Sequence, residues 1–220
     1  MRSSTRVSGV YSRAERVADA AVHVTGVLVA LLAAPALVFH ATVWLDDPGL
    51  VIAACVYALS LIAMVCCSAL YHMTPAEEWK DTLRRLDQSA IYLKIAGTYT
   101  PFAMMSGPQA MPFLAGLWAA AAAGVSIKLI ARGKLFGLTV GLYLAMGWAA
   151  VVVGAPILDR LTPTAYHLVL AGGLLYTVGV PFLIWERLPF HTMIWHVFVL
   201  TASLLLYAAV LIEYAGLGAA

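Results

Sequence analysis

Residues 50–71 have the sequence LVIAACVYALSLIAMVCCSALY, which contains no charged side chain. A helix needs about 20 consecutive apolar residues to cross the hydrocarbon core of a bilayer, and this stretch supplies them. The whole chain has the same character, because 63% of its 220 residues are hydrophobic, 11% are charged and the mean hydropathy is +0.90. Ordinary soluble domains carry roughly 25% charged residues. Lipid must therefore be the solvent for most of this chain.

Further apolar stretches, separated by short polar breaks, follow the same pattern along the chain. We predict an all-α polytopic membrane protein, a bundle of seven transmembrane helices. The predicted spans are residues 18–43, 50–71, 86–105, 111–130, 135–158, 165–185 and 193–214. Residues 1–17 are predicted to form a cytoplasmic N-terminal segment, and residues 18–215 a single membrane domain.

The basic side chains fall on alternate connections between the predicted spans, and this sets the predicted orientation. The connections on one side carry Arg2, Arg6, Arg13, Arg16, Lys80, Arg84, Arg85, Lys128, Arg132, Lys134 and Arg187. The opposite set holds only Arg160, and Lys94 lies within the third span. Cytoplasmic loops carry an excess of Lys and Arg. We therefore expect a multi-pass protein of the cell's inner (plasma) membrane, with the N-terminus in the cytoplasm and the C-terminus outside.

Composition also argues against several other classes. A formal net charge of +2 is too small to indicate a nucleic-acid partner. The cysteines are Cys55, Cys66 and Cys67, an odd number without a CxxC motif, so we expect no disulfide framework. Residues 1–16 are polar and basic without an apolar core, and we expect no cleavable signal peptide.

Ionisable side chains are costly inside a membrane, so those within or beside the spans are candidates for a functional site. Several lie toward the predicted cytoplasmic ends of four spans: Ser68 and His72, then Asp87, then His191 and His196, and, in the first span, Glu15, Asp19 and His23. Each also has an ordinary explanation when taken alone. A histidine at a membrane interface is often an amphipathic helix end, and Asp87, next to Arg84 and Arg85, can be a charge that the helix dipole favours.

The joint placement of Ser68, His72, Asp87 and His196 favours a metal site over these separate explanations. Ser68 and His72 are four residues apart and so share one helix face. Three imidazoles that leave one position open for water are typical of catalytic zinc, which lowers the pKa of that water to about 7. We predict that Asp87 orients the water or acts as a general base, and that Ser68 donates a hydrogen bond to the metal-bound oxygen or to the substrate.

Three stretches carry a resemblance to a known family: SALYH at 68–72, LDQSAIY at 86–92 continuing to GTYTPF at 97–102, and IWH at 194–196. They look like the bacterial hemolysin III group, which belongs with the progestin and adipoQ receptors and the alkaline ceramidases in a superfamily of proposed membrane hydrolases. Glu15, Asp19 and His23 resemble its N-terminal motif. The resemblance implies seven helices, a cytoplasmic N-terminus and a zinc ion held by three histidines at the cytoplasmic side. It assigns the serine, histidine and aspartate of the family to Ser68, His72 and Asp87, and the last ligand to His196.

The start of the last span departs from the family pattern. The receptor members have two histidines four residues apart there, whereas this chain has Thr192 at the first of these positions and His191 five residues before His196. Five residues on a regular helix leave two side chains about 140° apart. His191 can still be a ligand if it lies in the loop after Pro189. Otherwise the metal keeps fewer protein ligands, or His23 substitutes for His191.

These observations leave open several functions. The leading hypothesis is a zinc-dependent hydrolase of a lipid amide or ester, with a membrane lipid as its substrate. The second is a non-enzymatic membrane-homeostasis or lipid-sensing protein in which zinc is structural. The weakest is a pore-forming lysin, since the chain has no amphipathic segment that would insert from a soluble form. Asp87→Asn separates the first two, because hydrolysis predicts a folded but inactive protein.

Overall fold

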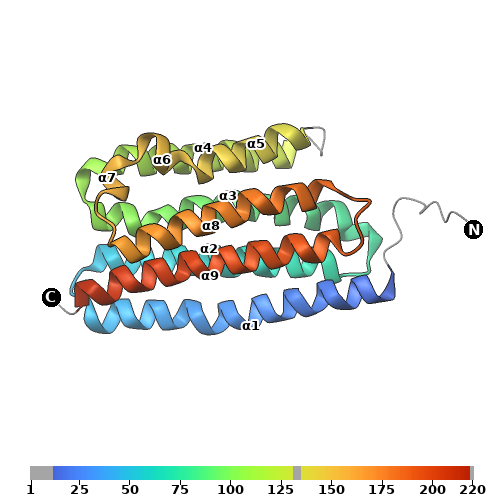
Figure 1. The fold of residues 1–220 in the computed structure, drawn as a ribbon, viewed down its shortest axis with the longest axis horizontal. Coiled ribbons are helices and arrows are strands. Elements are labelled where there is room, and N and C mark those ends of the chain that lie inside the picture. The colour runs from blue at the N-terminus through green and yellow to red at the C-terminus, as the bar shows by residue number, and fades with distance from the viewer. Residues whose placement is uncertain (1–11, 131–134, 219–220) are drawn as a thin grey trace, which may run out of the picture.

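The structure, a computed structural model, describes residues 12–130 and 135–218. This part of the chain is helical and contains no β-strand, which confirms the all-α prediction (Figure 1). Its elements in chain order are α1 (Arg13–Trp44), α2 (Pro48–Met73), α3 (Glu77–Ser106), the 3-10 turn η1 (Pro108–Ala110), α4 (Met111–Ile130), α5 (Phe136–Gly147), α6 (Ala149–Val153), α7 (Ala155–Leu158), α8 (Pro163–Ile184) and α9 (His191–Gly218). The predicted cytoplasmic cations Arg2, Arg6, Arg132 and Lys134 lie outside the described residues, as do residues 1–11 of the predicted N-terminal segment.

Five stretches of the described chain are helical, long and apolar enough to cross a bilayer: α1, α2, α4 together with η1, α8 and α9. The chain is therefore a polytopic helical membrane protein. The third predicted span lies within α3, which is 30 residues long but begins with a charged segment, EEWKDTLRR at 77–85. Helix covers most of each predicted span, while the number of spans in the bilayer and their orientation stay predictions.

The predicted span over residues 135–158 is mostly helical, but the structure divides it into α5, α6 and α7. Two residues explain the break after α6. Pro156 has no backbone N–H with which to continue the helical ladder. A Cβ added to Gly154 would lie 2.4 Å from the Cα of Ala150, so only glycine permits this close return of the chain. The break lets α7 pack against α3 and η1.

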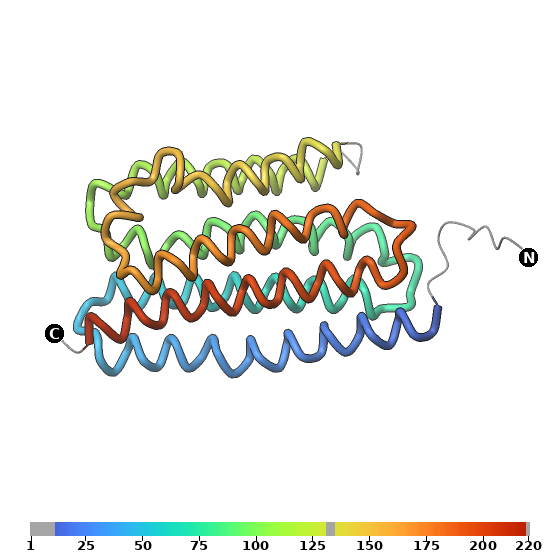
Figure 2. Tube along the Cα trace, viewed as in Figure 1, coloured from blue at the N-terminus to red at the C-terminus, as the bar shows by residue number. Residues whose placement is uncertain are grey.

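The helices form a bundle in which elements distant in sequence lie side by side. In Figure 1, α1 lies at one side of the bundle, α2 and α9 come next, α3 and α8 follow, and α4 to α7 lie at the other side. Contacts join α1 to both α2 and α9. Figure 2 shows that the start of α1, the end of α2 and the start of α9 meet at one end of the bundle. The polar residues that the sequence analysis selected lie on these segments.

The start of α1 is fixed to the start of α9 through Glu15. Ser12 is the N-cap of α1, and a reciprocal pair of hydrogen bonds with Glu15 forms a capping box. The Glu15 carboxylate also accepts a hydrogen bond of 3.0 Å from the backbone N–H of Phe190. Phe190 has a φ of 60°, a left-handed conformation that is rare outside glycine. Glu15 therefore stabilises the strained turn that leads into α9.

Small residues let α2 and α3 approach closely. Gly97 of α3 faces Ser60 of α2, and a Cβ added at Gly97 would lie 2.3 Å from the Ser60 Oγ and 2.7 Å from its Cβ. Close backbone approach at small residues is the usual basis of helix packing in membranes, where lipid supplies no hydrophobic drive between helices. Gly97 follows Asp87 by ten residues on α3, which is about 15 Å along the helix axis. The contact therefore helps to set the spacing between α2, which carries His72, and α3, which carries Asp87.

We expect Gly97→Val to lower the melting temperature of the detergent-solubilised protein, because overpacking of this kind costs about 1–3 kcal/mol. Gly116→Val is the matched control, since Gly116 is also helical but a Cβ there meets nothing within 4 Å. Thermal unfolding followed by circular dichroism measures both. Equal melting temperatures for the two variants would contradict the described packing of α2 against α3.

Candidate metal centre

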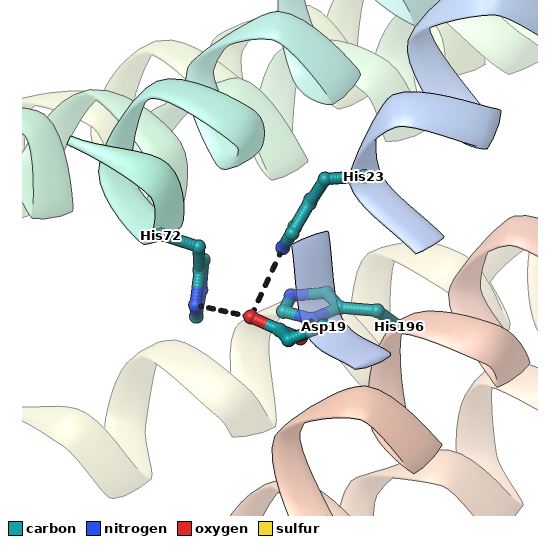
Figure 3. A group of neighbouring side chains, drawn as sticks. All are labelled: Asp19, His23, His72 and His196. Atoms are coloured by element: carbon teal, nitrogen blue, oxygen red, sulfur yellow. Dashed lines mark hydrogen bonds and ion pairs between the residues drawn. The ribbon is translucent and has the colours of Figure 1, made fainter. Parts of the chain in front are cut away.

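Four side chains from three helices meet at the end of the bundle where α1 begins. They are Asp19 and His23 of α1, His72 of α2 and His196 of α9, and one possible ligand atom from each lies within 4.8 Å of all the others. Figure 3 shows these side chains converging on one another. We refer to these four residues as the Asp–His cluster. The geometry brings together His72 and His196, as the sequence analysis required, although they are more than a hundred residues apart.

The carboxylate of Asp19 is the centre of this cluster. Its Oδ1 lies 2.9 Å from Nδ1 of His196, and its Oδ2 lies 3.2 Å from Nδ1 of His72 and 3.5 Å from Nε2 of His23. The ring centroids of the three histidines are 4.2 to 4.9 Å apart. One carboxylate therefore faces three closely packed imidazoles.

The local sequence explains how each residue reaches the cluster. Asp19 and His23 are four residues apart on α1, so they share a face. His72 lies in the last turn of α2, and His196 lies near the start of α9, whose position Glu15 fixes. The side chains of His23 and His196 are almost fully buried, while Asp19 and His72 remain 15% and 20% exposed. The cluster lies at the boundary between the buried bundle and its polar end.

The chemistry of this donor set fits a divalent metal ion. Tetrahedral zinc with bonds of about 2.0–2.1 Å places its ligand atoms about 3.3 Å apart. If Asp19 is itself a ligand, its separations of 2.9 to 3.5 Å from one nitrogen of each histidine bracket that value. The Nε2 atom of His23 is buried and makes no hydrogen bond within the described part of the chain. A buried ring nitrogen without a hydrogen-bond partner is costly, and a metal ion is one ligand that would satisfy it. The cluster can thus hold a metal ion.

Asp87 and Ser68, the predicted catalytic pair, lie beside the cluster. Ser68 lies close to the Asp87 carboxylate, which also interacts electrostatically with His72 and His23. Both residues line the same cavity as His23 and His196. The structure therefore places the predicted pair next to the imidazoles, and its catalytic role stays a prediction.

The explanation of Asp87 as a helix-dipole charge is wrong. The helix that carries it, α3, begins at Glu77, so Asp87 lies in its third turn, beyond the reach of the N-terminal dipole. The neighbouring Arg84 and Arg85 are not its partners, because both form ion pairs with Asp81. These pairs hold the pKa of the exposed Asp81 carboxyl below its usual value.

The structure does not bring His191 into the Asp–His cluster. His191 is the first residue of α9, where its Nδ1 lies 3.2 Å from the backbone carbonyl oxygen of Phe182 and its Nε2 lies 3.3 Å from the Thr192 hydroxyl. His23 occupies the third imidazole position instead, which was the alternative to His191. The spacing of five residues from His196 accounts for the difference, since the two side chains leave α9 in different directions.

Asp19 is the member of the cluster that sequence reasoning did not identify as a ligand. The sequence analysis placed it among the polar residues at the predicted cytoplasmic ends of the spans and in a segment resembling the N-terminal family motif. The available signal was its spacing of four residues from His23, which puts a carboxylate and an imidazole on one helix face. Thr192 at the position of a family histidine is a second signal, because a site that lacks one ligand needs another.

Two cavities adjoin the cluster from different sides. The bundle cavity, of about 180 Å³ and predominantly apolar, runs from His23, Asp87 and His196 to Phe102 and Leu161. The polar pocket, on the other side, is lined by residues that include Glu15, Arg16, Asp19, His72 and Lys80. The four residues of the cluster are divided between the two, so the Asp–His cluster lies between a predominantly apolar cavity and a pocket with charged lining residues.

We expect that alanine at His23, His72 or His196 sharply lowers the metal content of the purified protein, because each variant removes one imidazole from the cluster. His40→Ala is the control, since His40 lies four residues before the end of α1, far along that helix from His23. His191→Ala should retain the metal. Elemental analysis by mass spectrometry measures all five variants, and metal loss from His191→Ala with full occupancy in His23→Ala would contradict the described cluster.

Comparison with known proteins finds relatives over most of this chain. A family model described as haemolysin-III related matches residues 12–207. Hemolysin-3 of Bacillus cereus is 36% identical over 90% of this chain and 90% of its own length, and the hemolysin-3 homolog of Bacillus subtilis (strain 168) is 34% identical over 90% and 93%. The human monocyte to macrophage differentiation factor is 31% identical over 75% of this chain and 71% of its own length.

The family match covers all four residues of the Asp–His cluster and most of the chain's length. Together with the apolar helices, it identifies a multi-pass protein of the inner (plasma) membrane, as predicted. The chain belongs to the haemolysin-III-related family.

Proposed function

We propose that this protein is a zinc-dependent hydrolase that cleaves an amide or ester bond of a membrane lipid. The observation that carries the proposal is the position of the Asp–His cluster between the apolar bundle cavity and the polar pocket, with Asp87 and Ser68 beside it. A lipid hydrolase must bring an acyl chain and a water molecule to the same carbonyl carbon. The two cavities offer separate access for these reactants.

The residues proposed to hold zinc are His23, His72 and His196. A zinc ion bound there would polarise a carbonyl group and lower the pKa of a bound water molecule. Asp19 has a supporting role in this arrangement, because it accepts a hydrogen bond from Nδ1 of His196 and lies 3.2 Å from Nδ1 of His72, which favours the tautomers in which Nε2 is the ligand. The carboxylates of Asp19 and Asp87 supply two negative charges, which match the charge of a divalent cation.

Asp87 is the proposed proton-transfer group. Its carboxylate faces the same cavity as two of the imidazoles, and Ser68 lies close to it. It would accept a proton from the attacking water and return it to the leaving nitrogen or oxygen of the lipid. The acyl chain would lie in the bundle cavity, and the more polar part of the lipid would face the pocket lined by Arg16 and Lys80.

A non-enzymatic role with a structural metal is the second candidate, and one observation favours it. Structural zinc sites are closed by four protein ligands, whereas catalytic sites keep one position open. Asp19 lies within 3.5 Å of a nitrogen of each imidazole and can itself be the fourth ligand. A closed site of this kind would cross-link α1, α2 and α9 and suit a lipid-sensing or membrane-homeostasis protein.

We expect Asp87→Asn to lower the rate of lipid hydrolysis by about 100-fold or more, since a positioned acid–base group typically contributes 10²–10⁴-fold. The measurement uses purified, zinc-loaded protein and a panel of ceramides, acyl-amides and phospholipid and glyceride esters. Asp81→Asn is the control, because Asp81 lies on the same helix at an exposed position. Both variants should retain the fold and the metal.

Two results would contradict the proposal. The first is a wild-type protein with full zinc occupancy that hydrolyses no lipid in the panel. The second is an Asp87→Asn variant that hydrolyses lipid as fast as Asp81→Asn does. If the zinc-loaded wild type hydrolyses no lipid and the Asp87→Asn variant still performs the protein's function in cells, the metal has a structural role.

A further inference from the structure

A lysine lies in the middle of the membrane bundle, away from the Asp–His cluster. Lys94 follows Asp87 by seven residues on α3, which is about 10 Å along the helix axis and nearly two full turns. Both residues therefore share one face of α3, and both line the bundle cavity. Lys94 is 2% exposed. The proposed hydrolysis does not use this residue.

The contacts of Lys94 leave its charge without an anion. The Nζ donates a hydrogen bond of 2.6 Å to the Thr98 Oγ1, and that hydroxyl in turn donates to the Lys94 backbone carbonyl at 2.7 Å. The Nζ also lies 4.1 Å from the centroid of the Tyr57 ring. Within the described residues no carboxylate forms an ion pair with it. An ammonium group has three N–H donors, and Thr98 accepts only one of them.

A lysine in the interior of a membrane protein is costly unless it is paired, so its position indicates a function. The Tyr57 ring face and the Thr98 hydroxyl stabilise a cation weakly compared with a carboxylate in a medium of low dielectric constant. The nearest carboxylate on the same helix face is Asp87, two turns away. An anion that enters the bundle cavity would complete the pair.

We propose that Lys94 binds the carboxylate of a long-chain fatty acid whose tail lies in the apolar part of the bundle cavity. Beyond Lys94 the cavity continues along α3 past Tyr99 and Phe102 to Ile157 and Leu161, which form an apolar path suited to an alkyl chain. One ammonium group matches one carboxylate. A phosphate-bearing lipid headgroup would bring more charge than this single cation offsets, and Lys94 is the only Lys or Arg that lines the cavity within the described chain.

This inference does not rest on the proposed hydrolysis, because it requires only the cavity and the cation. It also differs in position from a carboxylate bound at the metal, since Lys94 lies about two helical turns from Asp87. The two positions predict different responses to substitution. Loss of an imidazole would weaken the binding of a fatty acid whose carboxylate lies at the metal. Loss of the lysine would weaken the binding of a fatty acid whose carboxylate lies deeper in the cavity.

The test measures binding of radiolabelled palmitate and hexadecanol to the purified protein in nanodiscs. Wild type should bind palmitate more tightly than hexadecanol. Lys94→Met should weaken palmitate binding about tenfold or more, because it removes a desolvated charge partner, while hexadecanol binding stays unchanged. Lys94→Arg should retain most of the preference for palmitate, and so should His196→Ala. Unchanged palmitate affinity in Lys94→Met, or loss of affinity in His196→Ala alone, would overturn the proposal.

A second measurement covers the case in which Lys94→Met does not fold. Solid-state NMR of wild type with ¹⁵N-labelled lysine and carboxyl-¹³C palmitate should show a dipolar contact between Nζ and the carboxyl carbon. Lys94→Arg keeps the charge and removes the labelled nitrogen, so the contact should disappear in that variant. Absence of the contact in wild type, or its persistence in Lys94→Arg, would show that the carboxylate binds elsewhere.

Discussion

The structure depends on the interaction of one carboxylate with the imidazoles around it. Asp19 lies within 3.5 Å of nitrogens of His23, His72 and His196, which come from α1, α2 and α9. Three imidazoles and a carboxylate would be expensive to leave near a bilayer without partners. Their convergence therefore requires the three helices to meet at one end of the bundle, and the turn that Glu15 holds at Phe190 places α9 for this purpose. The packing of the bundle and the chemistry of the site thus share a common constraint.

The position of the cluster determines what it can do. On one side is an apolar cavity long enough to follow α3 for several turns, and on the other is a pocket with charged side chains. A metal ion held between these spaces would meet a lipid chain and water at a single point, which the proposed hydrolysis requires and a purely structural site does not. The ambiguity between the two functions comes down to Asp19. As a ligand it closes the site, and as a hydrogen-bond acceptor for Nδ1 atoms it leaves a position for water.

The sequence predicted the helical class, the approximate spans and the meeting of His72, His196, Ser68 and Asp87, because hydropathy and the cost of buried polar groups are local properties. It did not predict the break at Gly154 and Pro156, because apolar composition alone does not reveal a bend that α3 and η1 accommodate. His191 was considered as a ligand because it is adjacent to Thr192, which occupies the position of a family histidine. The exchange of His191 for His23, and the inclusion of Asp19, depend on how α1 is rotated against α2 and α9, which is a tertiary property.

X-ray absorption spectroscopy of the zinc-loaded protein tests the central claim most directly, because it identifies the atoms around the metal. The account predicts a first shell of nitrogen and oxygen atoms at about 2.0–2.1 Å, with the multiple-scattering pattern of three imidazoles. The same measurement on His23→Ala should show one imidazole fewer. A shell that contains sulfur from Cys66 or Cys67, or one that is unchanged in His23→Ala, would contradict it.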